Sequence, residues 1–450
     1  MGVSATSLVV NRFLDHDGPA LIDAHGELSY SQLRALVAAR SREFDEAAPG
    51  LVVPVRQADT RAFLIDAFAV WSRGAALFPV DSKAPEAAVA PLLARLQPVP
   101  EQVMLVLATS GSSGPPKLVL LGCSGLLHNV DAILDYLPVA QASRIGLCSP
   151  LTYSYGLVGQ ALTCLRAGAC LVDLSCSAYA EEQIKLARAH DVHGVSSVPT
   201  HLRRWVRLLE EQQQTLPLRF VASAGAHLDV ETALRMKQVF SGGELFRQYG
   251  LTEYSPRVAA ISSADPGFDL GATGYPVRGT ECRVLDEHAM PVTANVDGEL
   301  WVRGPSTMLG YLGEPQSTAN VLSGDGWLKT GDSARIDEHG RLYISGRRDG
   351  VVKCAGERVS TEEVAEVIRG ISGVRDAVVI AISHRELGAE LCAFVEADES
   401  LRGLIRTALR ERLPLAKRPS AISFMAEIPR TSNGKWALAE LTALAQRKTT

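Results

Sequence analysis

VMLVLATSGSSGPPK, residues 103–117, joins a short apolar run to a loop of small and polar residues. The run 103–108 has the length and composition of a buried strand. The nine residues that follow contain four hydroxyl side chains, two glycines, two prolines and a lysine, which is typical of a loop. We therefore expect a core strand that ends in a loop at the edge of a sheet, where α/β proteins place their ligands.

Helical and strand patterns alternate on both sides of this loop. Upstream, the apolar residues of 59–74 lie on one helical face between a capping Asp59 and a terminating Gly74, and an apolar run follows at 76–80. Downstream, a helical pattern at 181–190 is followed by strand-like runs at 194–198, 219–222 and 244–249. This alternation predicts an α/β fold with a large N-terminal domain of mixed, largely parallel sheets flanked by helices.

The pattern changes twice towards the C-terminus. From about residue 265 the predicted strands are shorter and are separated by glycine and proline turns, which indicates a barrel-like β subdomain. After Asp349 we expect a compact α+β unit, with helices at 362–369 and 401–413 and strands at 377–382, 391–395 and 422–425. The sequence thus predicts a large N-terminal domain, residues 1–348, and a small C-terminal domain, residues 349–450.

Composition limits the classes of function. The chain has 450 residues, 46% of them hydrophobic and 21% charged, which suffices for two cores. Its net charge of −5 gives no basic surplus, so we expect neither a nucleic-acid partner nor a membrane partner. The eight cysteines form no Cys-x-x-Cys pair, and no signal peptide or membrane-spanning apolar stretch is evident. We therefore expect reduced thiols and a cytoplasmic protein.

The loop has the chemistry of a polyphosphate-binding site. Glycines allow backbone N–H groups to turn towards anionic oxygens, hydroxyl groups donate further hydrogen bonds, and Lys117 supplies a positive charge. The usual nucleoside-triphosphatase loop differs, because here Pro115 and Pro116 separate Gly114 from the lysine. Taken alone, the loop is equally compatible with a flexible turn.

Further motifs follow in order along almost the whole chain. They are LSYSQL (28–33), GAALFPVD (74–81), QYGLTE (248–253), KTGD (329–332), GRRDGVVKCAGER (346–358) and PRTSNGK (429–435). Together with the loop they resemble the signature motifs of the adenylate-forming superfamily, which comprises acyl- and aryl-CoA synthetases, luciferases and nonribosomal peptide adenylation domains. The resemblance implies an enzyme that uses ATP and Mg²⁺ to convert a small carboxylic acid into an acyl-adenylate, releasing pyrophosphate. The acyl group would then pass to the thiol of CoA or of the phosphopantetheine of an acyl or peptidyl carrier protein.

The resemblance assigns roles to residues of these motifs. The catalytic residues implied are Lys117, Thr252, Glu253 and Lys435. The nucleotide-binding residues implied are Thr109, Ser110, Gly111, Ser112, Ser113, Gly114, Gly225, Ala226, Tyr249, Gly250, Asp332, Arg347, Lys353 and Gly356. Glu253 would also hold Mg²⁺. A positive charge at Lys435 would bring together two anions, the carboxylate and the α-phosphate.

Elementary chemistry suits several of these roles. Tyr249 offers an aromatic face to adenine, although a strand-end aromatic could equally pack in the core. Asp332 offers acceptors to both ribose hydroxyls, braced by Arg347, although it could also cap a turn. In the family the small C-terminal domain is mobile. It would swing about a hinge at Asp349 after adenylation and replace the Lys435 face with the segment 353–356.

An acid-binding pocket is expected between the segment 150–157, the strand end at 223–225 and the residues after Glu253. The pocket residues predicted are Tyr153, Tyr155, Gly156, Ser223 and Ala224. No carboxylate occurs between Arg144 and Val172, so the ammonium group of an amino acid would be buried there without a partner. An acyl or aryl acid is therefore the predicted substrate.

The sequence departs from the family pattern at three places. One is Ser360-Thr361, which replaces the common Glu-Pro. Leu118 stands where glycine is usual, and Tyr153 stands where CoA synthetases often have histidine. Three alternatives remain open: adenylation of an amino acid, transfer to a non-thiol acceptor, and a catalytically degenerate nucleotide-binding homologue. The choice between CoA and a carrier protein also stays open, because both present the same pantetheine thiol.

Overall fold

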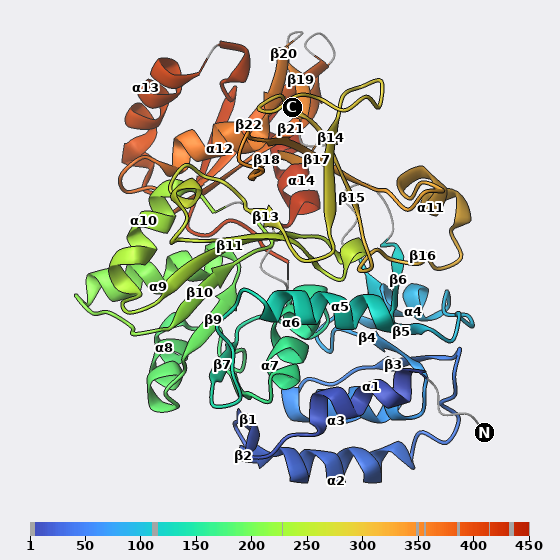
Figure 1. Cartoon of the computed structure of the whole chain (residues 1–450). Coiled ribbons are helices and arrows are strands. Elements are labelled where there is room, and N and C mark those ends of the chain that lie inside the picture. The colour runs from blue at the N-terminus through green and yellow to red at the C-terminus, as the bar shows by residue number, and fades with distance from the viewer. Residues whose placement is uncertain are drawn as a thin grey trace. The chain divides into compact units, whose positions relative to one another are not determined.

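The chain forms two compact units, both drawn in Figure 1. The computed structural model describes residues 5–109, 116–226, 228–347, 351–354, 357–384, 388–413, 415–431 and 436–449. The first unit contains Met1–Leu228, Thr232–Arg283 and Trp301–Thr330, and the second contains Asp229–Glu231, Val284–Leu300 and Gly331–Thr450. None of the helices in the described ranges combines the length and apolar character needed to span a bilayer.

The largest sheet belongs to the first unit and is mostly parallel. Six strands pair in parallel in the order β1, β8, β7, β9, β10, β11, while β2, β12 and β13 extend the two edges with antiparallel pairs. The central strands β8, β9 and β10 are buried along their whole length, as parallel strands enclosed by other layers are. In spatial order the nine described strands are β13 (Tyr275–Pro276), β12 (Arg257–Ser262), β11 (Glu244–Gly250), β10 (Phe220–Ser223), β9 (Gly194–Ser197), β7 (Arg144–Leu147), β8 (Cys170–Asp173), β1 (Pro19–Asp23) and β2 (Gly26–Ser29).

A five-stranded sheet of the same unit carries the glycine-rich loop. Ala108 lies opposite Leu118 in an antiparallel pair, so residues 109–117 connect two neighbouring strands. Leu118 is fully buried and packs in a core cluster with Val106 and Phe78, which explains its apolar side chain. The strands in spatial order are β16 (Gly310–Tyr311), β6 (Leu118–Gly122), β5 (Val103–Ala108), β4 (Ala76–Pro79) and β3 (Val52–Val55).

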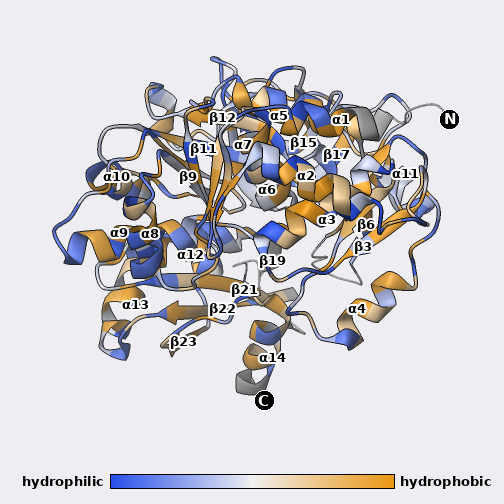
Figure 2. Ribbon diagram, turned by 90° about the horizontal axis from the view of Figure 1, so that it is seen from below, coloured by the Kyte–Doolittle hydropathy of each residue, from blue (hydrophilic) through white to orange (hydrophobic). Residues whose placement is uncertain are grey.

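The helices of the first unit begin and end at residues suited to those positions. The Asp59 carboxylate accepts the Ala62 N–H at 2.8 Å at the start of α3 (Thr60–Ser72), and Gly74 follows its end with a φ of +80°. α8 (Ala180–Ala189) and α9 (Pro199–Glu211) lie beside β9 and β10 (Figure 1), and much of α8 is hydrophilic (blue) in Figure 2. Other helices that lie wholly or mainly in this unit are α1 (Ala5–Leu14), α2 (Tyr30–Ser41), α4 (Glu86–Leu93), α5 (Cys123–Leu134), α10 (Val230–Val239) and α11 (Pro315–Val321).

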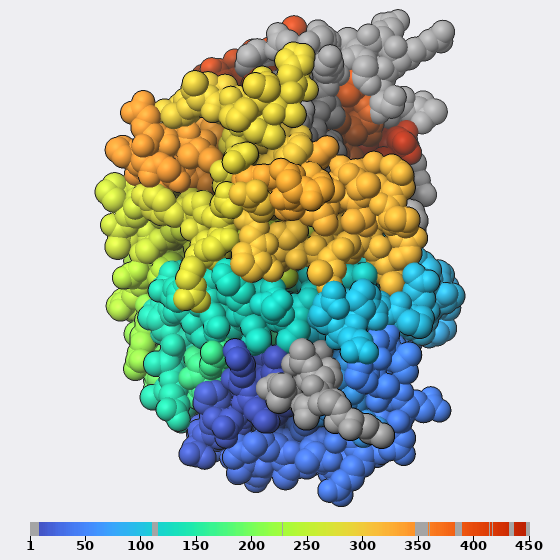
Figure 3. Space-filling view, turned by 45° about the vertical axis from the view of Figure 1, so that its right-hand side comes forward, coloured from blue at the N-terminus to red at the C-terminus, as the bar shows by residue number. Residues whose placement is uncertain are grey.

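One helical segment of the first unit is irregular. A π-helical stretch, Leu157–Leu162, connects α6 (Ser154–Gly156) to α7 (Thr163–Arg166). The Thr163 hydroxyl donates to the Val158 carbonyl at 2.9 Å, five residues earlier. Such turns insert one residue into a helix and are frequent at functional sites. On the face drawn in Figure 3 the residues around α4 (light blue) lie directly above blue residues from earlier in the chain, and both belong to the first unit.

The C-terminal part of the chain contains two more sheets. A four-stranded sheet has the order β14 (Glu281–Leu285), β15 (Gly298–Arg303), β17 (Leu328–Ile336) and β18 (Leu342–Arg347). The other sheet has the order β20 (Glu357–Ser360), β19 (Val351–Cys354), β22 (Gly388–Glu396) and β21 (Asp376–His384), and β23 (Ala421–Met425) pairs with β22.

Helices accompany this last sheet within the second unit. They are α12 (Thr361–Arg369), α13 (Arg402–Arg412) and α14 (Leu438–Thr449). α12 buries Val364 and Ile368 in a core cluster that also contains Val379 of β21. The α+β character predicted for this region is confirmed, whereas the hairpin of β19 and β20 and the helix α14 were not predicted.

Candidate active site

The glycine-rich loop is closed at its base by its first and last residues. The Thr109 N–H donates to the Lys117 carbonyl at 2.9 Å, and the Lys117 N–H lies 3.3 Å from the Thr109 hydroxyl. Arg95 donates to the Pro116 carbonyl at 2.6 Å and to Glu314 at 2.6 Å. The predicted phosphate ligands Ser110, Gly111, Ser112, Ser113 and Gly114 lie outside the described residues.

Tyr311 joins the loop to the predicted Mg²⁺ ligand. Its hydroxyl donates to the Glu253 carboxylate at 3.0 Å, and the Lys117 ammonium lies 4.7 Å from the centre of its ring. Tyr311 is placed by the pairing of β16 with β6, in which it lies opposite Val119. The Glu253 backbone is fixed as well, because its carbonyl accepts the Met308 N–H at 2.8 Å. The sequence analysis did not identify Tyr311.

Thr252 connects this group to the predicted acid pocket. Its hydroxyl lies 3.3 Å from the hydroxyl of Ser154. Thr252 begins a short 3₁₀ turn directly after β11, and the glycine before that turn is required, because a Cβ on Gly250 would lie 1.9 Å from the Pro256 carbonyl. Tyr249 is the penultimate residue of β11 and is partly exposed. A chain of contacts thus runs from Lys117 through Tyr311 and Glu253 to the Thr252–Ser154 pair.

The predicted pocket residues lie at the carboxyl ends of parallel strands. Ser223 ends β10 and is in register with Ser197, which ends β9. The Tyr155 hydroxyl lies 3.4 Å from the Ser197 carbonyl, so the segment after residue 150 meets this edge of the sheet. Gly156 is required, because a Cβ there would lie 2.2 Å from the Pro150 carbonyl.

The rest of the predicted pocket adds backbone constraints. Gly225 has a φ of +85°, which favours glycine, and the neighbouring Ala224 N–H donates to the Ser197 carbonyl at 3.3 Å. Ala226 is exposed, and Tyr153 immediately precedes α6. Burial raises the pKa of the Tyr155 hydroxyl above its usual range, so the hydroxyl stays neutral and can donate a hydrogen bond.

The remaining predicted residues belong to the second unit or lie outside the described residues. Asp332 of β17 is buried and is the register partner of Arg347 in β18. Lys353 is the register partner of Arg358 in the hairpin of β19 and β20. The predictions for Asp349, Gly356 and Lys435 fall outside the described residues.

Among the described residues, the chain of contacts from Lys117 to Ser154 includes one carboxylate, that of Glu253. Among the described residues no group of three His, Cys, Asp or Glu side chains could hold a metal ion. Mg²⁺ keeps several waters and takes one or two protein carboxylates together with substrate phosphates. Glu253 fits that requirement, because only one of its oxygens has a described hydrogen bond, from Tyr311.

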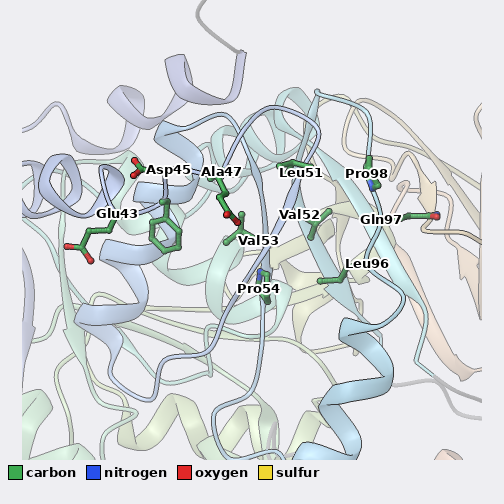
Figure 4. A pocket seen from close by; sticks show the side chains of 12 residues that line it. Glu43, Asp45, Ala47, Leu51, Val52, Val53, Pro54, Leu96, Gln97 and Pro98 are labelled. Carbon is green, nitrogen blue, oxygen red and sulfur yellow. The ribbon is translucent and has the colours of Figure 1, made fainter.

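One cavity of the described residues lies away from these residues. It has a volume of about 640 Å³ and lies beside the edge strand β3 (Figure 4). It is lined by Glu43, Phe44, Asp45, Glu46, Ala47, Leu51, Val52, Val53, Pro54, Leu96, Gln97 and Pro98. None of these residues belongs to a predicted motif, so this cavity is separate from the candidate site.

Two family models match the chain. The model of the AMP-binding enzyme matches residues 92–312, and that of the AMP-binding enzyme C-terminal domain matches residues 363–435. The 4-coumarate–CoA ligase-like 4 of Oryza sativa subsp. japonica is 31% identical over 356 residues, which are 76% of this chain and 63% of that protein. This chain therefore spans less than two thirds of the length of the rice protein.

Two further proteins are similar. The medium/long-chain-fatty-acid–[acyl-carrier-protein] ligase FadD10 of Mycobacterium tuberculosis is 30% identical over 371 residues, 77% of this chain and 67% of that protein. The ATP-bound structure of MatB from Rhodopseudomonas palustris superposes with a TM-score of 0.87 at 20% identity, covering 99% of this chain and 100% of that one. The chain therefore belongs to the adenylate-forming family of AMP-binding enzymes, whose two domains the two models match in order.

Proposed function

We propose that this chain uses ATP to convert a carboxylic acid into an acyl-adenylate, releases pyrophosphate, and transfers the acyl group to a pantetheine thiol. The observation that carries the proposal is the chain of contacts from Lys117 through Tyr311 to Glu253, continued by Thr252 and Ser154. These contacts link a loop suited to phosphate with a segment suited to the acid. Adenylation needs that proximity, because the carboxylate must attack the α-phosphorus.

The described residues have distinct tasks in this proposal. Lys117 supplies positive charge beside the phosphates, and Tyr311 fixes the position of that charge relative to Glu253. Thr252 donates its hydroxyl to a phosphate oxygen. Glu253 would hold Mg²⁺, which neutralises phosphate charge when it is bound. Lys435, by resemblance, brings the carboxylate and the α-phosphate together.

The acid in this proposal is an acyl or aryl acid rather than an amino acid. The described pocket residues Ser154, Tyr155 and Ser223 are neutral, so none would pair with an ammonium group. We propose a pantetheine thiol as the acceptor, either of CoA or of a carrier protein. The names of the rice and mycobacterial relatives, a CoA ligase-like protein and an acyl-carrier-protein ligase, support both possibilities.

We also propose two catalytic domains, residues 1–348 and 349–450, with a hinge at Asp349. The two family models support this division, because one ends before Asp349 and the other begins after it. Asp332 and Arg347 would hold the ribose, and both residues lie shortly before that hinge in the sequence. Lys353 and Gly356 would contribute to the second half-reaction.

ATP–pyrophosphate exchange over a panel of carboxylic acids tests the proposal. We expect acid-dependent exchange, AMP as the nucleotide product, and a hydroxamate of the activated acid when hydroxylamine is added. Lys117→Met should lower the exchange rate, whereas Lys237→Met, which alters a surface lysine bound to Asp269, should not. A degenerate nucleotide-binding homologue would show no exchange with any acid, and a kinase or ATPase would release ADP.

A further inference from the structure

Arg257 is a buried arginine with no described carboxylate beside it. It is the first residue of β12, and only 1% of its surface is exposed. No carboxylate of the described residues lies within salt-bridge distance, and its buried Nε and Nη2 atoms have no hydrogen-bond partner among them. Burial of a guanidinium without a counter-charge is costly, so a position like this indicates an anionic partner.

The guanidinium faces the segment predicted to line the acid pocket. Its central carbon lies 5.5 Å from the centre of the Tyr155 ring. Its Nη2 atom lies 3.6 Å from the point that a Cβ would occupy on Gly159, in the π-helical stretch. The absence of a side chain at Gly159 therefore leaves room next to the charged group.

The backbone of Arg257 is held in place by a buried asparagine. The Arg257 N–H donates to Asn129 Oδ1 at 2.9 Å, and Asn129 Nδ2 donates to the Arg257 carbonyl at 2.8 Å. Asn129 is fully buried in α5. The Arg257 backbone is thus fixed on both sides of its Cα, so the side chain leaves the strand from a fixed point.

The polar groups around this guanidinium are neutral. Burial raises the pKa of the Tyr136 hydroxyl, and Arg257 partly opposes that rise, which places the two groups close together. Gln248 Nε2 donates to the same hydroxyl at 2.8 Å, and Gln248 Oε1 is buried without a described partner. The cluster of Tyr136, Tyr155, Gln248 and Arg257 therefore carries one uncompensated positive charge.

Other arginines of this protein show what the Nε and Nη2 edge binds. Arg61 holds both oxygens of Asp23 with its Nε and Nη2 atoms, at 2.9 and 2.7 Å. Arg235 holds Glu210 with the same two nitrogens. In Arg257 these are the two nitrogens that lack a partner among the described residues. The planar fork matches the two oxygens of a carboxylate.

We propose that Arg257 binds a second carboxylate of the substrate, so that the protein activates a dicarboxylic acid at one end and holds it at the other. This inference rests on the proposed function, because Arg257 contacts Tyr155 of the predicted acid pocket. It narrows the substrate from any acyl or aryl acid to one with a remote anionic group. A monocarboxylic acid of the same length would leave the guanidinium unpaired, so it would bind more weakly.

Exchange with matched pairs of acids tests this inference. The pairs are glutarate with pentanoate, adipate with hexanoate, and benzene-1,4-dicarboxylate with benzoate. For wild type we expect kcat/KM to favour the diacid of at least one pair by about tenfold or more. Arg257→Met should lower kcat/KM for that diacid about 100-fold and leave the matched monoacid unchanged or improved, and Arg257→Lys should fall between.

A control variant and a binding measurement separate substrate recognition from folding. Arg235→Met, which removes an arginine paired with Glu210 instead, should leave the diacid preference intact. Arg257→Met should unfold at the same or a higher temperature than wild type, because it removes a buried unpaired charge. The preferred diacid should raise the Tm of wild type and not that of Arg257→Met.

Each remaining outcome decides against this inference alone or against this inference and the proposed function together. Exchange with monoacids alone, or equal losses for both acids of each pair in Arg257→Met, would overturn this inference and leave the proposed function standing. Exchange with no acid would contradict the proposed function and this inference together. A Tm that falls in Arg257→Met, with no change in diacid preference, would assign Arg257 a structural role.

Discussion

Tyr311 contributes to the candidate site both through its ring, which lies beside Lys117, and through its hydroxyl, which donates to Glu253. Nothing in the local sequence indicates this role, because Tyr311 is distant from both residues along the chain. Only the pairing of β16 with β6 brings it to the loop. The resemblance of the motifs predicted Lys117 and Glu253 as site residues, but it could not predict that Tyr311 contacts both.

Tyr311→Phe should lower kcat/KM for ATP in the exchange reaction by about tenfold or more, because a hydrogen bond to a charged group contributes about 1.5–3 kcal/mol. Tyr311→Phe retains the ring beside Lys117. Tyr311→Leu removes that ring as well, so it should lower the rate further. Tyr275→Phe is the matched control, since it removes an exposed hydroxyl that lies 3.0 Å from Asp265. Equal rates for Tyr311→Phe and the control would contradict the role of the hydroxyl.

Gly156→Ala should disturb the pocket segment, because its Cβ would lie 2.2 Å from the Pro150 carbonyl. We expect a loss of about 1–3 kcal/mol in stability and a lower exchange rate, as overpacking typically produces. Gly324→Ala is the control, because no atom lies within 4 Å of its added Cβ. Thermal unfolding and exchange should both distinguish the two variants, and similar values would show that the segment adapts.

At the scale of elements, the junction between β9 and α9 contains a buried histidine. The Ser197 hydroxyl lies 2.6 Å from His201 Nδ1, and His201 Nε2 lies 2.5 Å from Gln183 Oε1. One ring nitrogen accepts and the other donates, which is the arrangement of a neutral ring. Burial, assisted by Arg204, lowers the pKa of His201 to about 4. This junction holds Ser197 in place, and the Tyr155 hydroxyl lies 3.4 Å from the Ser197 carbonyl.

His201 should make the protein less stable in mild acid. The unfolded chain takes up this proton near its ordinary pKa of 6.5, whereas the folded chain does so only near 4. The free energy of unfolding should therefore fall as the pH drops from about 6.5 towards 4, by about 3 kcal/mol in total from this group. Urea unfolding at pH 7.5, 6 and 5 measures the slope.

His201→Gln should lack this part of the pH dependence of the unfolding free energy. Its stability relative to wild type should therefore rise as the pH falls. His288→Gln, which alters an exposed histidine, should keep the slope of wild type. Parallel slopes for wild type and His201→Gln would show that the buried ring is not the group that titrates.

The sequence predicted regular elements better than irregular ones. Apolar periodicity located α3, β5, β9 and α12 because each buries one face or a whole strand. The π-helical stretch Leu157–Leu162 was missed, since all of its residues, including the polar Gln160, are buried and give no amphipathic period. The hairpin of β19 and β20 was missed because its mixed polar residues give no clear alternation.

At the scale of the whole molecule, the resemblance of the sequence motifs to those of the family predicted the fold. The contacts in the structure show how the motif residues lie relative to one another. The structure brings together Lys117, Glu253, Thr252 and the pocket segment within the first unit. Arg257 lies shortly after the motif QYGLTE, but only its burial in the structure identifies it as a candidate binding residue. Burial and pairing depend on contacts between distant segments, so one sequence cannot give them.

Lys435→Ala should abolish adenylate formation and leave thioester formation from supplied acyl-adenylate largely intact. The reason is that Lys435 serves the approach of two anions, which occurs only in the first half-reaction. Exchange measures the first half-reaction, and release of AMP from a synthetic acyl-adenylate with CoA or a carrier protein measures the second. Equal losses in both would contradict the division of labour between the two domains.

The position of the glycine-rich loop between β5 and β6 has a consequence for slow motions. Thr109 and Lys117 close a loop whose flanking strands are among the most deeply buried of the chain. Amide protons of the buried residues of β5 and β6 should therefore exchange with solvent only when the first unit unfolds as a whole. A protein that still protects those amides still holds the two strands that carry the proposed phosphate-binding loop.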